Sequence, residues 1–362
     1  MGTSDWRHFE ALFDTGSHPA HPMLHPDFAR ALADVRDDTF VIFLKREAEV
    51  IGYWPVHLRP GRWMRAIGGP FSDVQGPILK TDIAVDLQEV LSKAGVRGIT
   101  LPGLAHHDSL NPTGLRPRQV HLTRLERGWE GVLDEQTRQH KRFFKNHWRL
   151  DRKLRRDHDA VEFVFDDTRP ESLRRLLDLK SQQFRATGRH DVIASAWAQD
   201  LIHCLYTQRD RGVSARLSGL FVDGELAAGE LNLQSGGYLH GWLTGFDHRF
   251  ADYSPGHLLV RLILEAMADN GLTTYDAGVG HGHYKKYFSN AEATLWRGTV
   301  RSPGSAQTMS GFASAAWRAV EEKGPPAMQS VLAKVRRRSD QILTSEPDLS
   351  GRLKGFWKAV VK

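Results

Sequence analysis

Cysteine is almost absent from this sequence: Cys204 is the only one among 362 residues. A single thiol cannot close an intramolecular disulfide or supply a cysteine-based zinc knuckle, so both kinds of staple are excluded. No run of 18 apolar residues occurs, so no segment is long enough to span a bilayer. The first 30 residues are polar and rich in His and Pro, which argues against a signal peptide. We therefore expect a cytoplasmic protein.

The remaining composition is that of an ordinary globular protein, with 40% hydrophobic and 25% charged residues. At roughly 150 residues per domain, the length predicts about two domains. Basic residues outnumber acidic ones, 49 to 43, which gives a net charge of +6. This excess suits an anionic ligand, a nucleotide or an acidic lipid surface equally well, and does not choose among them.

One order of elements occurs twice along the chain. In each half, a hairpin is followed by a third strand, a loop with glycine and proline or a polar turn, a helix and a further strand. In the first half we expect these elements at 40–45, 50–57, 63–67, 82–94 and 98–101. In the second half we expect them at 216–222, 225–233, 238–245, 254–270 and 273–277. We interpret this order as a tandem repeat of one α/β unit.

A basic segment with interleaved aromatic residues, 138–158, separates the two repeats. Phe143, His147, Leu150 and Leu154 recur at helical spacing, which predicts one helix with an apolar stripe. Two interpretations stay open. The segment is either a linker helix with its stripe in the core, or a basic helix that faces an anionic acceptor or CoA phosphates.

After Arg301 the chain changes character, and helices are expected at 308–322 and 326–344. Lys334 and the three arginines 336–338 form a short basic cluster there. A solvated helix face is the default interpretation of this cluster. Peripheral contact with the inner face of a membrane, or with a regulatory nucleotide, is the alternative.

The clearest chemical signal is the start of the predicted helix near residue 254, where Pro255 and Gly256 follow a strand. A helix start leaves N–H groups unpaired and carries the positive end of the helix dipole, which suits a phosphate. Three histidines also lie nearby in the sequence, His257, His281 and His283. They lack Cys or Glu at ligand spacing, so we expect no metal site.

Acid–base residues are expected on the two strands that flank this helix. His240 is the expected base, because the ordinary pKa of histidine lies near working pH. Asp276, near the end of its strand, is expected to act as a base or to orient a substrate, and Tyr284 to act as an acid or hydrogen-bond donor. A structural histidine and an aspartate that caps local backbone are the alternatives for the first two.

Several segments together resemble a known family. They are Leu220–Ala228, Tyr253–Leu259, Tyr275–Gly278 and Tyr284–Phe288, with a weaker match at Ile67–Asp73. Their order resembles the GNAT-type acyltransferases of the BioF2-like group, associated with cellulose and exopolysaccharide biosynthesis and related to the FemABX aminoacyl transferases. The resemblance covers about residues 20–300.

This resemblance implies an α/β (α+β) fold with tandem GNAT-like domains, each a mixed, mostly antiparallel sheet flanked by helices, plus a helical C-terminal extension. The boundaries we expect are 1–137 for the first GNAT-like domain, 138–212 for the basic linker and following helices, 213–302 for the acyltransferase domain, and 303–362 for the extension.

The resemblance also implies acetyl-CoA or another acyl-CoA as co-substrate. The residues expected to hold it are Thr244, Tyr253, Ser254, Gly256, His257, Leu258 and Lys285, and those expected to bind the acceptor are Trp242, Gly69, Ser72 and Asp73. The chain departs from the GNAT pattern in one place. Asp252–His257 replaces the pyrophosphate loop Arg/Gln-x-x-Gly-x-Gly/Ala, and only Gly256 and the helix start remain.

The leading hypothesis is therefore an acyl-CoA-dependent N- or O-acyltransferase that acts on a sugar or polysaccharide precursor by direct transfer, with a general base and a tyrosine acid. An aminoacyl-tRNA-dependent transferase of FemABX type is the first alternative, favoured by the basic segment. A non-catalytic GNAT-fold binding protein, regulated by a nucleotide or a membrane contact, is the second.

Overall fold

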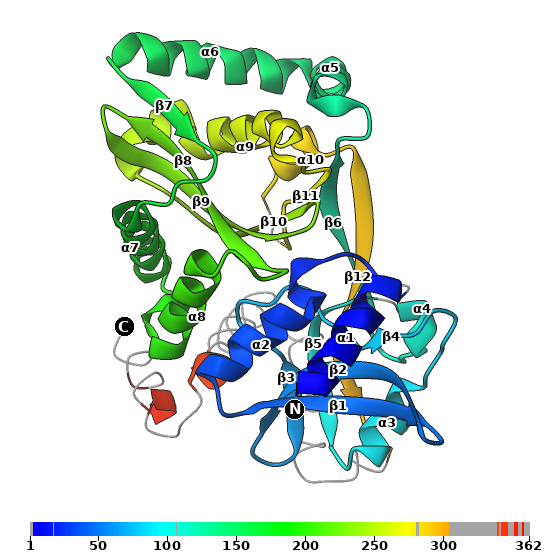
Figure 1. The fold of residues 1–362 in the computed structure, drawn as a ribbon. Coiled ribbons are helices and arrows are strands. Elements are labelled where there is room, and N and C mark those ends of the chain that lie inside the picture. The colour runs from blue at the N-terminus through cyan, green and yellow to red at the C-terminus, as the bar shows by residue number, and fades with distance from the viewer. Residues whose placement is uncertain are drawn as a thin grey trace, which may run out of the picture.

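The computed structural model of the chain describes residues 3–16, 18–105, 107–279, 282–303, 339, 342–346, 351–353 and 357. Their strands form one 12-stranded mixed sheet, and helices pack against both of its faces (Figure 1). The predicted α/β fold class is thereby confirmed.

The first half of the sheet follows the predicted order. Its elements are the hairpin β1 (Thr39–Arg46) and β2 (Glu49–Arg59), then β3 (Trp63–Ala66), the short β4 (Ile78–Leu79), α3 (Leu87–Lys93) and β5 (Gly98–Leu104). β3 pairs antiparallel with β2 and parallel with β5. The helix begins later than residue 82 because Asp86 caps it, its carboxylate accepting the N–H groups of Gln88 and Glu89.

The second half repeats this arrangement. Its elements are the hairpin β8 (Ser214–Val222) and β9 (Glu225–Ser235), then β10 (Tyr238–Phe246), α9 (Pro255–Ala266) and β11 (Thr274–Asp276), with β7 (Val161–Val164) at the edge beside β8. β10 pairs antiparallel with β9 and parallel with β11. The expected repeat of elements is confirmed, although α9 ends before the short turn η4 (Ala268–Asn270) rather than at residue 270.

Two strands that the sequence reasoning missed join the halves by exchange. β6 (Arg116–Arg124), from the first half, pairs with β11 of the second half. β12 (Ala291–Arg301), which follows the second half, pairs with β5 of the first half and also with β6. The central order is therefore β3-β5-β12-β6-β11-β10, one continuous sheet through both repeats.

The remaining helices cover the two faces of this sheet. They are α1 (Thr3–Thr15), η1 (Pro22–Leu24), α2 (Pro26–Val35), α4 (His107–Leu110), α5 (Gly128–Gln139), α6 (Lys141–Asp157), α7 (Pro170–Ala186), η2 (Val192–Ala194), α8 (Ala196–Thr207), η3 (His248–Tyr253) and α10 (Lys285–Phe288). α7, α8 and α2 share one apolar core with the sheet, whereas α5, α6 and α9 share a second core (Figure 1).

The basic segment forms two helices instead of the single one expected at 138–158. α5 and α6 are separated at His140, whose backbone is not helical (φ −125°, ψ 45°). The buried side chains of α6 are Phe144, His147, Leu150 and Leu154. The predicted stripe is therefore in the core, as the linker interpretation requires. Its first buried residue is Phe144 instead of the predicted Phe143.

The expected C-terminal helices and the basic cluster at 334–338 lie outside the described residues, apart from residue 339 and parts of 342–357. In the part of the chain that is described, no helix is both long and apolar enough to cross a membrane.

Acid is expected to destabilise the fold through buried histidines. Burial lowers the pKa of His147 to about 4, and His21 shows the same lowering to about 4. Between pH 6.5 and 4 these histidines are protonated in the unfolded chain but stay neutral in the folded chain. Their contribution to the free energy of unfolding is therefore fully present above pH 6.5 and is lost as the pH falls toward 4. Each histidine accounts for roughly 3 kcal/mol of this loss.

Urea unfolding at pH 7.5 and pH 4.5 measures the effect, and His147→Gln isolates one residue. The variant should lose less stability than the parent on acidification. If the parent and the variant lose the same free energy of unfolding between pH 7.5 and pH 4.5, His147 does not contribute to the acid sensitivity.

Candidate functional site

The site is organised by β10 and β11, the parallel pair of the second half. Their pairing ends with His240 opposite Asp276. β10 also has a bulge between Gly241 and Leu243, which changes the face to which the following side chains point. The carboxyl ends of parallel strands are where α/β sheets bind ligands, so this point is the natural place to look for chemistry.

A cavity of about 330 Å³ lies where α9 begins, beside β9 and β10. Its volume is within the range of small-molecule sites. Ser254 has a left-handed backbone (φ 53°, ψ 53°) that turns the chain into α9, and Pro255 follows at the first helical position. The lining residues are Gln183, Gly229, Glu230, Thr244, Gly245, Phe246, Ala251, Ser254, Pro255, Gly256, His257, Leu259, Val260 and Tyr284.

The first turn of α9 offers this cavity a polar backbone. The carbonyl oxygen of Ser254 accepts the N–H groups of His257 and Leu258. A Cβ added at Gly256 would meet nothing within 4 Å, so the backbone of this residue is open to a ligand. Open backbone at the positive end of a helix dipole is a site for an anion such as phosphate.

Glu230 is the one acidic residue among those that line the cavity, and the sequence reasoning missed it. It lies on β9 opposite Thr244 and is 2% exposed, with the Tyr275 hydroxyl donating to its Oε1 at 2.8 Å. Burial raises the pKa of Glu230 to about 6, against the opposing effect of the Tyr275 hydrogen bond. The sequence feature that could have identified Glu230 is its position as a lone carboxylate between Ala-Ala-Gly and Leu-Asn-Leu in an otherwise apolar strand.

Tyr284 and His257 lie together at the cavity, with their ring centroids 4.8 Å apart. Burial, with a contribution from the nearby Glu230 charge, raises the pKa of Tyr284 well above its usual value. The phenol therefore keeps its proton at any physiological pH and acts as a hydrogen-bond donor. Burial also lowers the pKa of His257, which favours its neutral form.

Most of the residues predicted to hold the donor line this cavity: Thr244, Ser254, Gly256 and His257. Three others do not. Leu258 is buried in the apolar core, and the Tyr253 hydroxyl donates to Asp157. The Lys285 ammonium donates to the carbonyl oxygens of Ala277 and Gly278, at 2.5 and 2.9 Å, so it secures the end of β11. A direct contact between any of these three and the donor stays a prediction.

His240 and Asp276, predicted as acid–base residues, are in contact but outside the cavity lining. His240 Nδ1 lies 3.2 Å from Asp276 Oδ2, and both residues are buried. His21, from the N-terminal turn η1, places its Nε2 3.3 Å from the same oxygen. Asp276 also accepts the Tyr238 hydroxyl and the N–H of Gly278.

The protonation pattern of this cluster follows from its hydrogen bonds. His21 Nδ1 accepts the N–H of Met23, so a neutral His21 carries its proton on Nε2, toward Asp276. Burial alone would raise the pKa of Asp276, but His240 and His21 outweigh it and hold that pKa well below its usual value. His21, His240 and Asp276 have the composition of a metal site. In this structure they form a hydrogen-bonded network, and the expected absence of a metal stays a prediction.

The predicted acceptor residues gather beside this cluster. The Trp242 indole donates to the carbonyl oxygen of Phe71 at 2.8 Å, which fixes the loop 68–73 against β10. Asp73 Oδ2 then lies 3.9 Å from His240 Nε2. The Ser72 hydroxyl is buried and donates to Val74, and Gly69 lies on the same loop. Acceptor binding by these residues stays a prediction.

Comparison with known proteins agrees with this geometry. Residues 141–286, which include most of the cavity, match the family model of an acetyltransferase (GNAT) domain. The crystal structure of FemX is similar over 80% of this chain and 95% of its own, with 12% identity and a TM-score of 0.51. A tandem GNAT protein from the clavulanic acid biosynthesis pathway is similar over 82% and 94%, with 12% identity and a TM-score of 0.48.

No curated protein matches the chain at a significant level. The FemX likeness shows a shared fold. The exopolysaccharide group that the sequence resembles is not distinguished by these matches and stays a prediction. The match of residues 141–286 to an acetyltransferase (GNAT) domain supports an acyltransferase.

Proposed function

We propose that the protein is an acyl-CoA-dependent N- or O-acyltransferase, with acetyl-CoA as the expected donor and a sugar or polysaccharide precursor as the acceptor. The cavity at the start of α9 carries this proposal, because a helix N-terminus, a buried carboxyl and a half-buried phenol meet there. Transfer from a thioester needs those three functions: an anion site for the CoA diphosphate, a base, and a donor for the leaving sulfur.

The donor binds with its diphosphate at the first turn of α9, near Gly256 and Ser254. The thioester arm then enters the cavity toward Glu230 and Tyr284. Gly229 and Gly245, which face each other across β9 and β10, line the cavity beside this path.

Glu230 is the base in this proposal. With a pKa of about 6 it is ionised at neutral pH yet basic enough to accept the proton of an acceptor O–H or N–H. The acceptor atom bonds to the acyl carbon, the C–S bond breaks, and the sulfur leaves as a thiolate.

The proton then passes from Glu230 to the thiolate, which is favourable because a thiol has a pKa of about 8.5. Tyr284, whose pKa is raised well above that of a free phenol, holds its own proton too tightly for that transfer and donates a hydrogen bond to the sulfur instead. This division of roles refines the expected tyrosine acid.

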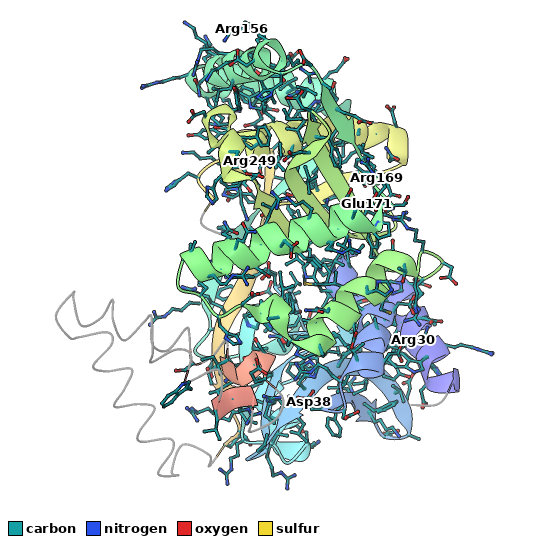
Figure 2. All side chains as sticks on the ribbon, turned by 90° about the vertical axis from the view of Figure 1, so that its left-hand side faces the viewer. Arg30, Asp38, Arg156, Arg169, Glu171 and Arg249 are labelled. Carbon is teal, nitrogen blue, oxygen red and sulfur yellow. The ribbon has the colours of Figure 1, made fainter. Side chains whose placement is uncertain are left out.

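A second candidate donor, an aminoacyl-tRNA, is favoured by one observation. The outer side of α6 carries exposed cations that make no ion pair among the described residues, Lys141, Arg142, Lys145 and Arg152. Arg156 marks the far end of this helix in Figure 2. The other end reaches the cavity, where the Phe143 and His257 ring centroids are 5.8 Å apart.

A thermal-shift titration separates the two donors. Acetyl-CoA at about 100 times its Kd should add about 2.7 kcal/mol of apparent stability, with free CoA and adenosine 3′,5′-bisphosphate as partial ligands. If these three leave the melting temperature unchanged, acyl-CoA is not the donor. Binding of tRNA that weakens steeply with salt would then support the second candidate.

A further inference from the structure

His240 is buried, yet one of its nitrogens has no partner. Its Nδ1 is committed to Asp276 at 3.2 Å, and the His21 ring packs against it with centroids 4.7 Å apart. Its Nε2 makes no hydrogen bond within the described residues, and Asp73 Oδ2 lies 3.9 Å away from it. Leaving a buried polar atom without a hydrogen bond is destabilising, so this nitrogen is a candidate for a contact with a ligand.

The free nitrogen lies beside the place where β10 and β11 cease to pair. A Cβ added at Gly278 would be 3.4 Å from the His240 ring and 3.1 Å from the carbonyl oxygen of Gly241. A Cβ at Gly241 would in turn be 3.2 Å from Glu230 Oε1. Neither position has room for a side chain, because a Cβ at Gly241 would crowd Glu230 and a Cβ at Gly278 would crowd the backbone beside the His240 ring.

The surroundings of His240 favour its charged form. Burial lowers its pKa, but Asp276 and then Asp73 outweigh burial, so the pKa is raised above the ordinary 6.5. The other charged or titratable groups that face it are His21, Lys285 and Glu230, and Tyr238 shares Asp276. His21 stays neutral because its own pKa is lowered to about 4.

We propose that His240 is the electrostatic stabiliser of the acyl-transfer step, its Nε2–H donating to the acyl carbonyl oxygen as that oxygen becomes an oxyanion. Asp276 and His21 act as positioning residues that hold the ring. His21 and Asp73 come from the first half of the chain, so this half completes the site instead of being an inert repeat.

This inference rests on the proposed function, and it assigns His240 no covalent change. As the acceptor attacks, the carbonyl π electrons move to oxygen and the Nε2–H bond to that oxygen strengthens. When the tetrahedral intermediate collapses, the C=O bond re-forms and the sulfur leaves.

Isotope-edited infrared spectroscopy of bound [1-¹³C]acetyl-CoA tests this directly and needs no acceptor. In the parent protein the carbonyl stretch should lie at lower frequency than in free acetyl-CoA. His240→Phe should return it to the free value, whereas His240→Gln, which keeps an N–H donor, should retain part of the shift. His203→Phe, at an exposed histidine of α8, is the matched control and should change nothing.

The pH dependence of the same band distinguishes a charged donor from mere packing. The shift should disappear as pH rises through the pKa of His240, and Asp73→Asn should move that loss to lower pH because one stabilising carboxylate is gone. A carbonyl band that is the same in the parent and in His240→Phe overturns the inference while leaving the donor assignment intact. Failure of acetyl-CoA to bind would instead refute the proposed function.

Discussion

Glu230→Gln is expected to lower kcat by about 10²–10⁴-fold, the usual contribution of a general base. The amide cannot accept the acceptor's proton, although its oxygen can still accept the Tyr275 hydroxyl, so the fold should persist. The activity of the parent protein should rise as pH increases through about 6, where Glu230 ionises. The pH–activity profile of the variant should lack this rise. CoA release with glucosamine as acceptor, measured between pH 5 and 8, gives both quantities.

Glu225→Gln is the matched control, because Glu225 lies on the same hairpin but is exposed and pairs with Arg249, which Figure 2 labels. Its activity should equal that of the parent. Tyr275→Phe offers a finer check. Loss of the Tyr275 hydrogen bond should raise the pKa of Glu230, so the rise of activity should move to higher pH. Full activity of folded Glu230→Gln would show that the base is elsewhere.

Gly256→Asp should weaken acetyl-CoA binding by roughly 10- to 100-fold while leaving the fold intact. A carboxylate about 5 Å from a phosphate repels it by about 3 kcal/mol at an effective dielectric constant of about 20. The backbone at Gly256 leaves space for a side chain. An acidic residue in the first turn also favours the helix dipole, by about 0.3–1 kcal/mol. The melting temperature of the free protein should therefore rise slightly as donor affinity falls.

Opposite changes in stability and affinity are hard to explain by damage to the fold. Gly256→Asn, which has the same shape without the charge, should bind acetyl-CoA much more tightly than Gly256→Asp. The difference between them should shrink at high salt, because the repulsion is screened. If calorimetry finds equal affinities for the two variants, the diphosphate does not bind at the start of α9.

Local sequence patterns predicted the repeated elements because hairpins, alternating strands and an amphipathic helix are determined by residues that are close together in the sequence. β6 and β12 were missed for the opposite reason. Their partners lie far away in the chain, so no adjacent hairpin marks them as part of the sheet, although Ala-Glu-Ala-Thr-Leu alternates at the start of β12. The break at His140 was also missed, since the basic stretch continues through it without proline or glycine.

The donor side of the site could be predicted from the sequence, because a helix start with Pro255 and Gly256 is a local feature. Glu230 could not, since a glutamate in a strand ordinarily faces solvent, and only the packing of α9 and Tyr275 shows that it is buried. His240 was singled out for its residue type alone. The carboxylates that set its charge come from β11 and from a loop of the first half, a juxtaposition that only the tertiary fold creates.

The exchange of β6 and β12 imposes an order on biosynthesis. β5 ends at Leu104, but its neighbour β12 begins only at Ala291, so the first repeat leaves the ribosome with an open strand edge. At about 5–20 residues per second, that edge waits on the order of ten to forty seconds for its partner. An exposed edge invites pairing with other chains during this interval. Nascent chains truncated before residue 291 should therefore need chaperones more than the finished protein does.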